Sequence, residues 1–224
     1  MIRAVIFDMF ETLITLYESP LYFGPQIAED VGIPVEKFLS LWNSMEHDRC
    51  IGKLTFEDTM ENILQHYNCY SKKLIEDIKQ KRISAKREVF CHLHSEIIPM
   101  LSKLKENNIL IGLISNTFSE EEIVIRESIL FSYFDAVFLS SEQGICKPDE
   151  QIFNRCTNSL SVQPEECLYI GDGGSYELET AHKLGMKAAQ AVWYLKEGTL
   201  QPTGRKNDFM QLERPMDILK YCGV

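Results

Sequence analysis

Polar and charged side chains stand at the ends of short apolar runs in this sequence, where they could do chemistry. They are Asp8, Ser115, Asn116, Thr117, Lys147, Asp172 and Glu177. Taken singly, each has an ordinary explanation, such as a helix N-cap for a serine or a tight turn around an aspartate. Taken together, they supply carboxylates, a hydroxyl, an amide and an ammonium group. Mg²⁺ prefers a few carboxylates together with water and phosphate oxygens, so the set favours a Mg²⁺ site beside a bound anion.

Five apolar runs predict the strands that must bring these side chains together. They are "VIF" from residue 5, "ILIGLIS" (109–115), "AVFLSS" (136–141), "CLYIGD" (167–172) and "AAQAVWY" (188–194). From about residue 97 onward these runs alternate with helical spacing, which is typical of a parallel sheet with helices on both faces. We therefore predict an α/β fold with a Rossmann-like, doubly wound parallel sheet. Ligands of such sheets bind outside the carboxyl ends of the strands, where the polar side chains fall.

The stretch from residue 17 to residue 90 has a different pattern. It lacks a convincing strand and holds amphipathic helical runs such as "VEKFLSLWNSM" and "TFEDTMENILQHY". We interpret it as an inserted α-helical cap domain, residues 17–90, over an α/β core made of residues 1–16 and 91–224. The alternative interpretation is a single mixed domain.

The bulk composition limits the partners. The chain has 224 residues and a formal net charge of −10, which argues against nucleic acid and anionic membranes because both attract basic surfaces. No run approaches the roughly 20 apolar residues that a membrane helix needs. The 7 cysteines include no CxxC pair, a pattern that suits reduced thiols in the cytoplasm. We expect a cytoplasmic monomer or homodimer that binds a small anionic molecule.

The order Asp8, Ser115, Lys147, Asp172 resembles the four-motif signature of the haloacid dehalogenase (HAD) superfamily of hydrolases. The phrases "ISN", "KPDEQIF", "YIGDGG" and "AHKLGM" are similar to that family's usual motifs, and the resemblance covers essentially the whole chain. The stretch 17–90 resembles the helical cap that one group of these proteins carries after the first strand.

The resemblance implies a role for each motif. Asp8 would be the nucleophile and would form an acyl-phosphate or alkyl-ester intermediate. Ser115 and the main chain of Asn116 would hold the oxygens of the transferring group, while Lys147 would neutralise charge on the nucleophile and the intermediate.

The resemblance also implies a Mg²⁺ cofactor. Asp8, Asp172 and the main-chain carbonyl of Phe10 would bind the ion. Glu177 takes the position of a further acid in the last motif and would orient the water bound to the metal.

Three residues are predicted to contact the substrate: Phe10, Thr117 and Arg49. The first two adjoin the nucleophile and the oxygen-holding motif. Arg49 belongs to "DRCIGKLTFED", which resembles a phrase common in caps of this type, and it would reach down to an anionic group of the substrate. The structural alternative for Arg49 is a solvated residue at a helix end.

One position departs from the family. Phosphatases of this superfamily generally read Asp-x-Asp-x-Thr, where the second Asp moves a proton, but this chain has Phe10 in its place. General acid–base assistance is worth about 10²–10⁴ in rate, so ordinary phosphomonoester hydrolysis should suffer. Glu11 is adjacent but should point to the opposite side of a continuing strand. A histidine of "CHLH" (91–94) that faces the cleft is another source of the proton.

This departure leaves three functions open. The first, which we favour, is a Mg²⁺-dependent phosphatase-type hydrolase of a small phosphorylated metabolite with a modified acid step, suited to acyl or aryl phosphates. The second is a 2-haloacid dehalogenase-like C–X hydrolase, whose halide leaving group needs no proton. Those dehalogenases lack the acids present here as Asp172 and Glu177, and they carry a cap arginine where this chain has Asn43. The third is a catalytically weak phosphate-binding or regulatory protein.

Overall fold

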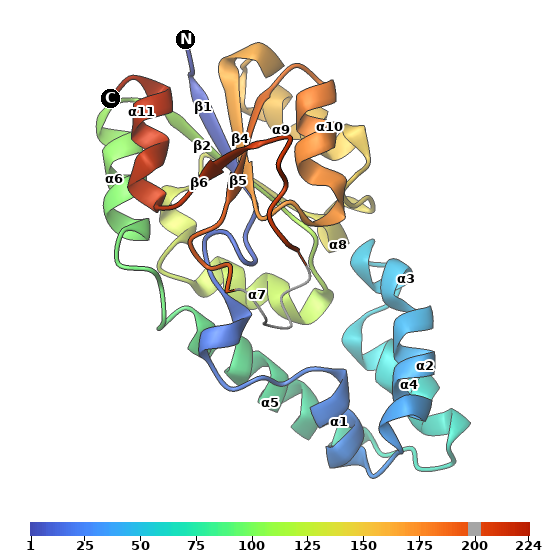
Figure 1. Cartoon of the computed structure of the whole chain (residues 1–224). Helices are drawn as coiled ribbons and strands as arrows, with labels where there is room; N and C mark the ends of the chain where they lie inside the picture. Colours follow the sequence, from blue (N-terminus) through green and yellow to red (C-terminus); the bar gives the residue numbers. More distant parts are fainter. Residues whose placement is uncertain (197–202) are drawn as a thin grey trace.

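Six strands form one parallel sheet within residues 1–196 and 203–224, the parts of the chain that the computed structural model describes (Figure 1). They are β1 (Ala4–Phe7), β2 (Leu110–Ser115), β3 (Ala136–Leu139), β4 (Cys167–Gly171), β5 (Lys187–Ala191) and β6 (Met210–Leu212). The order across the sheet is β3-β2-β1-β4-β5-β6, and every neighbouring pair is parallel. The strand order reverses between β1 and β4, where doubly wound sheets bind their ligands. The predicted fold class is confirmed.

Both faces of the sheet are covered, which explains its continuous apolar strands. In β1, Val5 and Phe7 enter one hydrophobic core while Ala4 and Ile6 enter the other, and all four are fully buried. The first core is covered by α6 (Ile97–Glu106), α7 (Ser119–Glu127) and α11 (Ile218–Cys222), and the second by α9 (Glu150–Leu160) and α10 (Glu177–Lys183). Shorter helical segments are α8 (Ser140–Gln143), η1 (Leu16–Glu18), η2 (Phe131–Tyr133), η3 (Pro164–Glu166), η4 (Gly174–Tyr176) and η5 (Pro215–Asp217).

The far edge of the sheet differs from the prediction. The short strand β6 was not predicted, and the run 188–194 was predicted as strand to its end although β5 stops at Ala191. Trp193 and Tyr194 leave the sheet and turn to the loop after β1. Trp193 Nε1 donates to the carbonyl of Thr12 at 2.9 Å, and the Tyr194 hydroxyl donates to the next carbonyl at 3.3 Å. This aromatic pair therefore anchors the loop that follows Asp8.

Residues 17–90, called the helical insert below, contain no strand and lie beyond the carboxyl ends of the strands (Figure 1). The helices are α1 (Gly24–Val31), α2 (Val35–Ser44), α3 (Glu46–Cys50), α4 (Phe56–His66) and α5 (Lys72–Val89). They bury an apolar cluster of their own around Phe38, Trp42 and Phe56. The division into a separate core and cap stays a prediction. No helix in the described residues combines the length and the apolar character needed to span a membrane.

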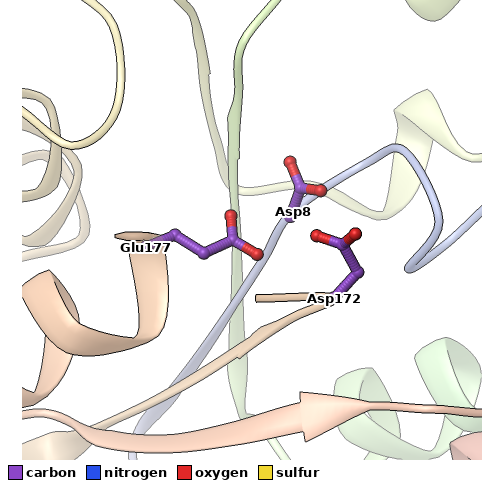
Figure 2. Close-up of side chains that lie close together, drawn as sticks. All are labelled: Asp8, Asp172 and Glu177. Carbon is purple, nitrogen blue, oxygen red and sulfur yellow. The ribbon is translucent and has the colours of Figure 1, made fainter. Parts of the chain in front are cut away.

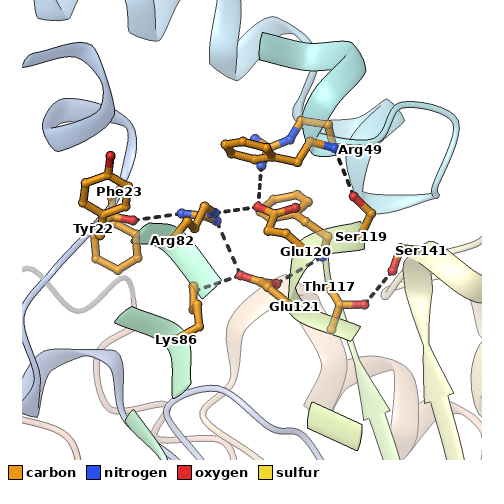
Figure 3. Close-up of polar contacts among 12 residues, drawn as sticks. Tyr22, Phe23, Arg49, Arg82, Lys86, Thr117, Ser119, Glu120, Glu121 and Ser141 are labelled. Atoms are coloured by element: carbon orange, nitrogen blue, oxygen red, sulfur yellow. Dashed lines mark hydrogen bonds and ion pairs between the residues drawn. The ribbon is translucent and has the colours of Figure 1, made fainter. Parts of the chain in front are cut away.

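A buried ionic cluster joins the helical insert to α7 (Figure 3). Arg82 Nε lies 2.5 Å from Glu120 Oε1, to which Arg49 Nη2 also approaches at 3.3 Å. Lys86 Nζ lies 2.8 Å from Glu121 Oε1. All five side chains are buried, so two carboxylates of α7 offset part of the charge of three cations of the insert away from water.

Candidate active site

Three carboxylates meet at the carboxyl end of the sheet (Figure 2). Asp8 follows β1 and Asp172 follows β4, and the register holds these ends together because the Asp8 N–H donates to the carbonyl of Ile170 at 2.9 Å. Glu177 begins α10 and points toward both. One oxygen of each carboxylate lies within 4.8 Å of the other two. Gly171 permits the approach, since a Cβ there would stand 1.9 Å from Glu177 Oε1.

Lys147 joins two of these carboxylates. Its buried Nζ lies 2.5 Å from Asp8 Oδ1 and 2.5 Å from Glu177 Oε2. The Tyr169 hydroxyl donates to the same Glu177 oxygen at 2.9 Å. Asn116 fixes the lysine's backbone, because its Oδ1 accepts from the Lys147 N–H at 2.8 Å and its Nδ2 donates to the Lys147 carbonyl at 3.1 Å. The end of β2 therefore positions the lysine against the nucleophile predicted after β1.

The electrostatics of this cluster follow from burial and from an excess of carboxylates. Burial raises the pKa of Asp8, and nearby Asp172 adds to the rise while Lys147 opposes it. Burial raises the pKa of Glu177 to about 8, and the charges of Asp8 and Asp172 add to the rise. The ammonium group of Lys147 acts in the opposite direction and lowers this pKa. Burial alone would lower the pKa of Lys147, but the two paired carboxylates outweigh burial and raise it. One ammonium group does not neutralise three carboxylates.

The donor set is compatible with a divalent cation. Fully ionised, the three carboxylates and Lys147 leave an excess of negative charge, and Mg²⁺ prefers such oxygen donors. The two Glu177 oxygens already accept protein hydrogen bonds, one from the Gly173 N–H at 3.1 Å and the other from Lys147 and Tyr169. Glu177 therefore positions Lys147 as well as adding negative charge.

A cavity of about 200 Å³ opens in front of these groups. It is lined by Asp8, Phe10, Glu11, Leu16, Tyr17, Asn116, Lys147, Asp172, Gly174, Ser175 and Glu177. Ser115, at the end of β2, is fully buried, and its hydroxyl has no hydrogen-bond partner among the described residues. Buried hydroxyls normally have a partner, and an oxyanion bound at this strand end would supply one. Five of the predicted residues thus line one small polar cavity, namely Asp8, Asn116, Lys147, Asp172 and Glu177. Ser115 is the residue before Asn116 and is not itself among the lining residues.

Glu11 lies elsewhere than expected. The sequence interpretation continued the strand past Asp8 and pointed Glu11 away, but β1 ends at Phe7 and Glu11 has a left-handed φ of 57°. The chain therefore turns, and Glu11 lines the cavity. Its Oε1 accepts from the Leu16 N–H at 2.8 Å and its Oε2 from the Thr15 hydroxyl at 2.8 Å. These contacts anchor the segment that carries Tyr17 into the cavity.

Arg49 is neither solvated nor among the residues that line the cavity. Its guanidinium lies 3.7 Å from the ring centre of Trp42 and 4.0 Å from that of Phe118, and it pairs with Glu120. The solvated alternative is therefore wrong, because aromatic stacking and a carboxylate from α7 hold this side chain in the interior. The predicted substrate contact stays a prediction, since Nε and Nη1 of Arg49 have no hydrogen-bond partner among the described residues. Asn43, at the position compared with the dehalogenase arginine, is exposed on α2.

Three further candidates also lie outside the residues that line the cavity. The Thr117 hydroxyl lies 3.0 Å from the Ser141 hydroxyl, so it connects the β2 loop to α8 rather than reaching the cavity. His92 Nε2 lies 3.2 Å from the Glu88 carboxylate, and His94 Nδ1 accepts from a backbone N–H at 3.2 Å. Neither histidine lines the cavity, so the cleft-facing histidine considered from the sequence is not found there.

Four residues of the site were missed in the sequence. Leu16, Tyr17 and Ser175 line the cavity from the segments after β1 and β4. Their position depends on local turns that apolar periodicity does not report. Tyr169 did carry a signal, because a tyrosine inside a fully buried strand needs a partner for its hydroxyl.

Comparisons with known proteins agree with this arrangement. A model of the haloacid dehalogenase-like hydrolase family matches residues 2–185. The glyceraldehyde 3-phosphate phosphatase of Methanopyrus kandleri is 24% identical over 98% of this chain and 96% of that protein. The human N-acylneuraminate-9-phosphatase is 33% identical over 47% of this chain and 42% of that protein. The 2-haloacid dehalogenase structure from Pseudomonas syringae pv. Tomato DC3000 has a TM-score of 0.75 and 20% identity, covering 100% of this chain and 99% of that one. The chain belongs to the haloacid dehalogenase-like hydrolase family.

Proposed function

We propose that this protein is a Mg²⁺-dependent phosphatase-type hydrolase of a small phosphorylated molecule, with Asp8 as its nucleophile. The observation that carries the proposal is the pairing of a nucleophilic carboxylate with both a buried lysine and two further acids. The phosphatases among the relatives support it. The structural similarity to a dehalogenase, at 20% sequence identity, supports the fold and not the reaction.

The acidic cluster favours phosphoryl transfer over halide displacement. Displacement of a halide needs no metal ion beside the nucleophile, and without a metal ion Asp172 would add repulsion there. The described part of the insert also directs neither Arg49 nor Asn43 into the cavity as a halide receptor.

In the proposed reaction an Asp8 oxygen attacks phosphorus, the bond to the leaving oxygen breaks, and an acyl phosphate forms. Water then attacks that phosphorus, the acyl–oxygen link to phosphorus breaks, and phosphate leaves. Lys147 holds the nucleophile and offsets its charge, while the Ser115 hydroxyl donates to a phosphoryl oxygen. Mg²⁺ bound by Asp8, Asp172 and the Phe10 carbonyl would supply neutralisation of the phosphoryl charge.

Phe10 sets the expected substrate preference. Phe10 lines the cavity, and Lys86 Nζ lies 4.9 Å from the centre of its ring. A phenyl ring transfers no proton, so substrates whose leaving group is stable as an anion should react best. Acyl phosphates and aryl phosphates meet that condition, whereas alkyl phosphates do not.

The test is an activity panel with an aryl phosphate, acetyl phosphate and a 2-haloacid, each in Mg²⁺ and in EDTA. Phosphate release that EDTA abolishes supports the proposal. Halide release that persists in EDTA contradicts it and favours the dehalogenase. Phosphate binding without turnover of any of the three substrates favours a regulatory binding protein.

Mg²⁺ is expected to stabilise the folded protein. A ligand at about 100 times its Kd adds about 2.7 kcal/mol to the free energy of unfolding, and the melting temperature should rise by several degrees. Because protons compete for carboxylates whose pKa is raised, as for Glu177 at about 8, the gain should shrink as the pH falls. Thermal melts with Mg²⁺ and with EDTA measure it. Asp172→Asn should remove most of the gain, whereas Asp208→Asn, a change at an exposed aspartate, should keep it.

Phe10→Asp is expected to raise turnover of an alkyl phosphate about 10-fold, below the 10²–10⁴ typical of general acid–base assistance. The gain is limited because nearby Lys86 attracts the new carboxylate. Rates with an aryl phosphate should change little. Phe10→Asn is the matched control, since it opens the same space without a transferable carboxyl proton. An equal gain in both variants would mean that space, and not proton transfer, limits the reaction.

A further inference from the structure

A segment near the C-terminal end of the chain contacts the acidic cluster. The Thr203 hydroxyl donates to Asp172 Oδ2 at 2.8 Å. Thr203 begins residues 203–206, which follow β5 in the chain and lie beyond residue 185, where the match to the family ends. The contact therefore brings to the site a residue that none of the four motifs contains.

A buried glutamine holds this segment in place. Gln190 belongs to β5, and its side chain is fully buried. Its Nε2 donates to the carbonyl of Asp172 and to the carbonyl of Gly204, each at 2.8 Å, and its Oε1 accepts from the Lys206 N–H at 2.8 Å. Buried polar groups need such partners. One side chain thus joins the backbone of Asp172 to the segment that carries Thr203.

The turn after β4 leaves room for the segment. Gly173 has a left-handed φ of 92°, and a Cβ there would stand 2.9 Å from Cδ and Cε of Lys206. A Cβ on Gly174 would stand 3.1 Å from Asp172 Oδ1 and 3.7 Å from Thr203 Oγ1. The two glycines therefore let residues 203–206 pack directly on the turn, and the Thr203 hydrogen bond is one of several contacts.

Thr203 reaches Asp172 from outside the catalytic cavity. It is not among the residues that line that cavity, and it lines with Asp172 and Gln190 a separate cavity of about 10 Å³. The Gly174 N–H donates to Asp172 Oδ1 at 2.8 Å, so each oxygen of this carboxylate accepts one hydrogen bond from the protein. An ionised carboxylate has about four lone-pair sites. Both oxygens therefore keep the capacity to bind a cation.

We propose that Thr203 is a positioning residue that orients the Asp172 carboxylate for Mg²⁺. Rotation of a carboxylate about its last side-chain bond is only weakly restricted, and a hydrogen bond to each oxygen fixes it. Hydrogen-bond partners of metal ligands contribute about 10–100-fold to metal affinity. Thr203 acts through Asp172 and not on the substrate. The inference rests on the proposed Mg²⁺ site of Asp8 and Asp172.

The test measures the binding of Mg²⁺ alone to the whole protein by isothermal titration calorimetry, without substrate. Thr203→Val keeps the shape of the side chain and removes its hydroxyl, so the Kd for Mg²⁺ should rise about 10-fold. Thr203→Ser keeps the hydroxyl and should keep the wild-type Kd. Thr157→Val is the matched control, because the buried Thr157 hydroxyl donates to the Asn154 carbonyl within α9 at 3.1 Å. It should bind Mg²⁺ like the wild type.

Turnover of an aryl phosphate and thermal melts add two readouts. Thr203→Val leaves the reacting groups in place, so saturating Mg²⁺ should restore the wild-type kcat, at an Mg²⁺ concentration about 10-fold higher. Melting temperatures in EDTA report any effect on the fold without the metal. A residue that only anchors the segment would lower the melting temperature equally in EDTA and in Mg²⁺ and would leave the Kd unchanged.

Each result decides the inference. An unchanged Kd in Thr203→Val overturns it, and so does tighter binding, which would mean that the hydroxyl competes with Mg²⁺ for Asp172. A weaker affinity that Thr203→Ser shares overturns it as well. Weaker binding by Thr203→Val in a protein that turns over no substrate supports the inference and contradicts the proposed function. Turnover that EDTA abolishes, with equal Kd values in the wild type and Thr203→Val, does the reverse. A wild type that binds no Mg²⁺ overturns both.

Discussion

Replacing Asp8 with asparagine is expected to lower phosphate release by about 10⁴-fold or more, the scale seen when a covalent nucleophile is removed. The amide has nearly the shape of the carboxylate and can still accept a hydrogen bond from Lys147, which now stands 2.5 Å from Asp8 Oδ1. The fold should therefore persist. Turnover of an aryl phosphate and the melting temperature, measured on the same preparation, separate loss of chemistry from loss of structure.

The matched control is Asp208→Asn, which makes the same chemical change at an exposed position and should keep full activity. Trapping adds a second readout, because brief incubation with substrate should leave an acid-stable phosphoryl group on the wild type and none on Asp8→Asn. If Asp8→Asn keeps more than about a tenth of the rate, another group is the nucleophile.

Replacing Lys147 with methionine should reduce both activity and stability. Its Nζ is the buried positive partner of Asp8 and Glu177, and removing one partner of a buried ion pair costs about 3–5 kcal/mol. Loss of a preorganised charge at the reacting centre costs about 10²–10³ in rate. Denaturant unfolding and turnover of an aryl phosphate measure the two losses.

The stability loss in Lys147→Met should depend on pH. Without the ammonium group the pKa values of Asp8 and Glu177, already raised in the folded protein, rise further. The folded state then binds more protons than the unfolded state, so stability falls as the pH rises through those folded pKa values. The deficit against wild type should be greatest above neutral pH and shrink in acid.

Lys183→Met is the control for the Lys147 substitution. Lys183 is exposed and pairs with Glu150 at the surface, where such pairs contribute about 0–1 kcal/mol. It should change neither turnover nor the pH dependence. Equal stability of the two variants would mean that Lys147 does not compensate buried charge.

The position of the acidic cluster could be predicted because it depends on topology alone. Parallel strands end at the same edge of a sheet, so Asp8 and Asp172, each one residue past an apolar run, had to be neighbours if the runs were strands. The loop that carries Lys147 was placed by the same reasoning. The chemical role assigned to each of these residues followed from the resemblance to the family and not from the strand pattern.

Other positions could not be predicted, since they depend on contacts distant in sequence or on single backbone angles. Glu11 reaches the cavity because Glu11 itself takes a left-handed φ. The residue type glutamate does not predict that conformation. Arg49 is held by Trp42 and Phe118, and the latter comes from the core side of the structure. Strand β6 has three residues and one neighbour, too short for periodicity to detect.

The ionic cluster between the helical insert and α7 has a consequence for how the molecule unfolds. Pulling the insert away would separate Arg82 and Lys86 from Glu120 and Glu121, and the same movement would take Arg49 off the ring of Phe118. Partial opening therefore loses several buried contacts together. The apolar cluster of the insert and those of the sheet should act as one cooperative unit with a single transition.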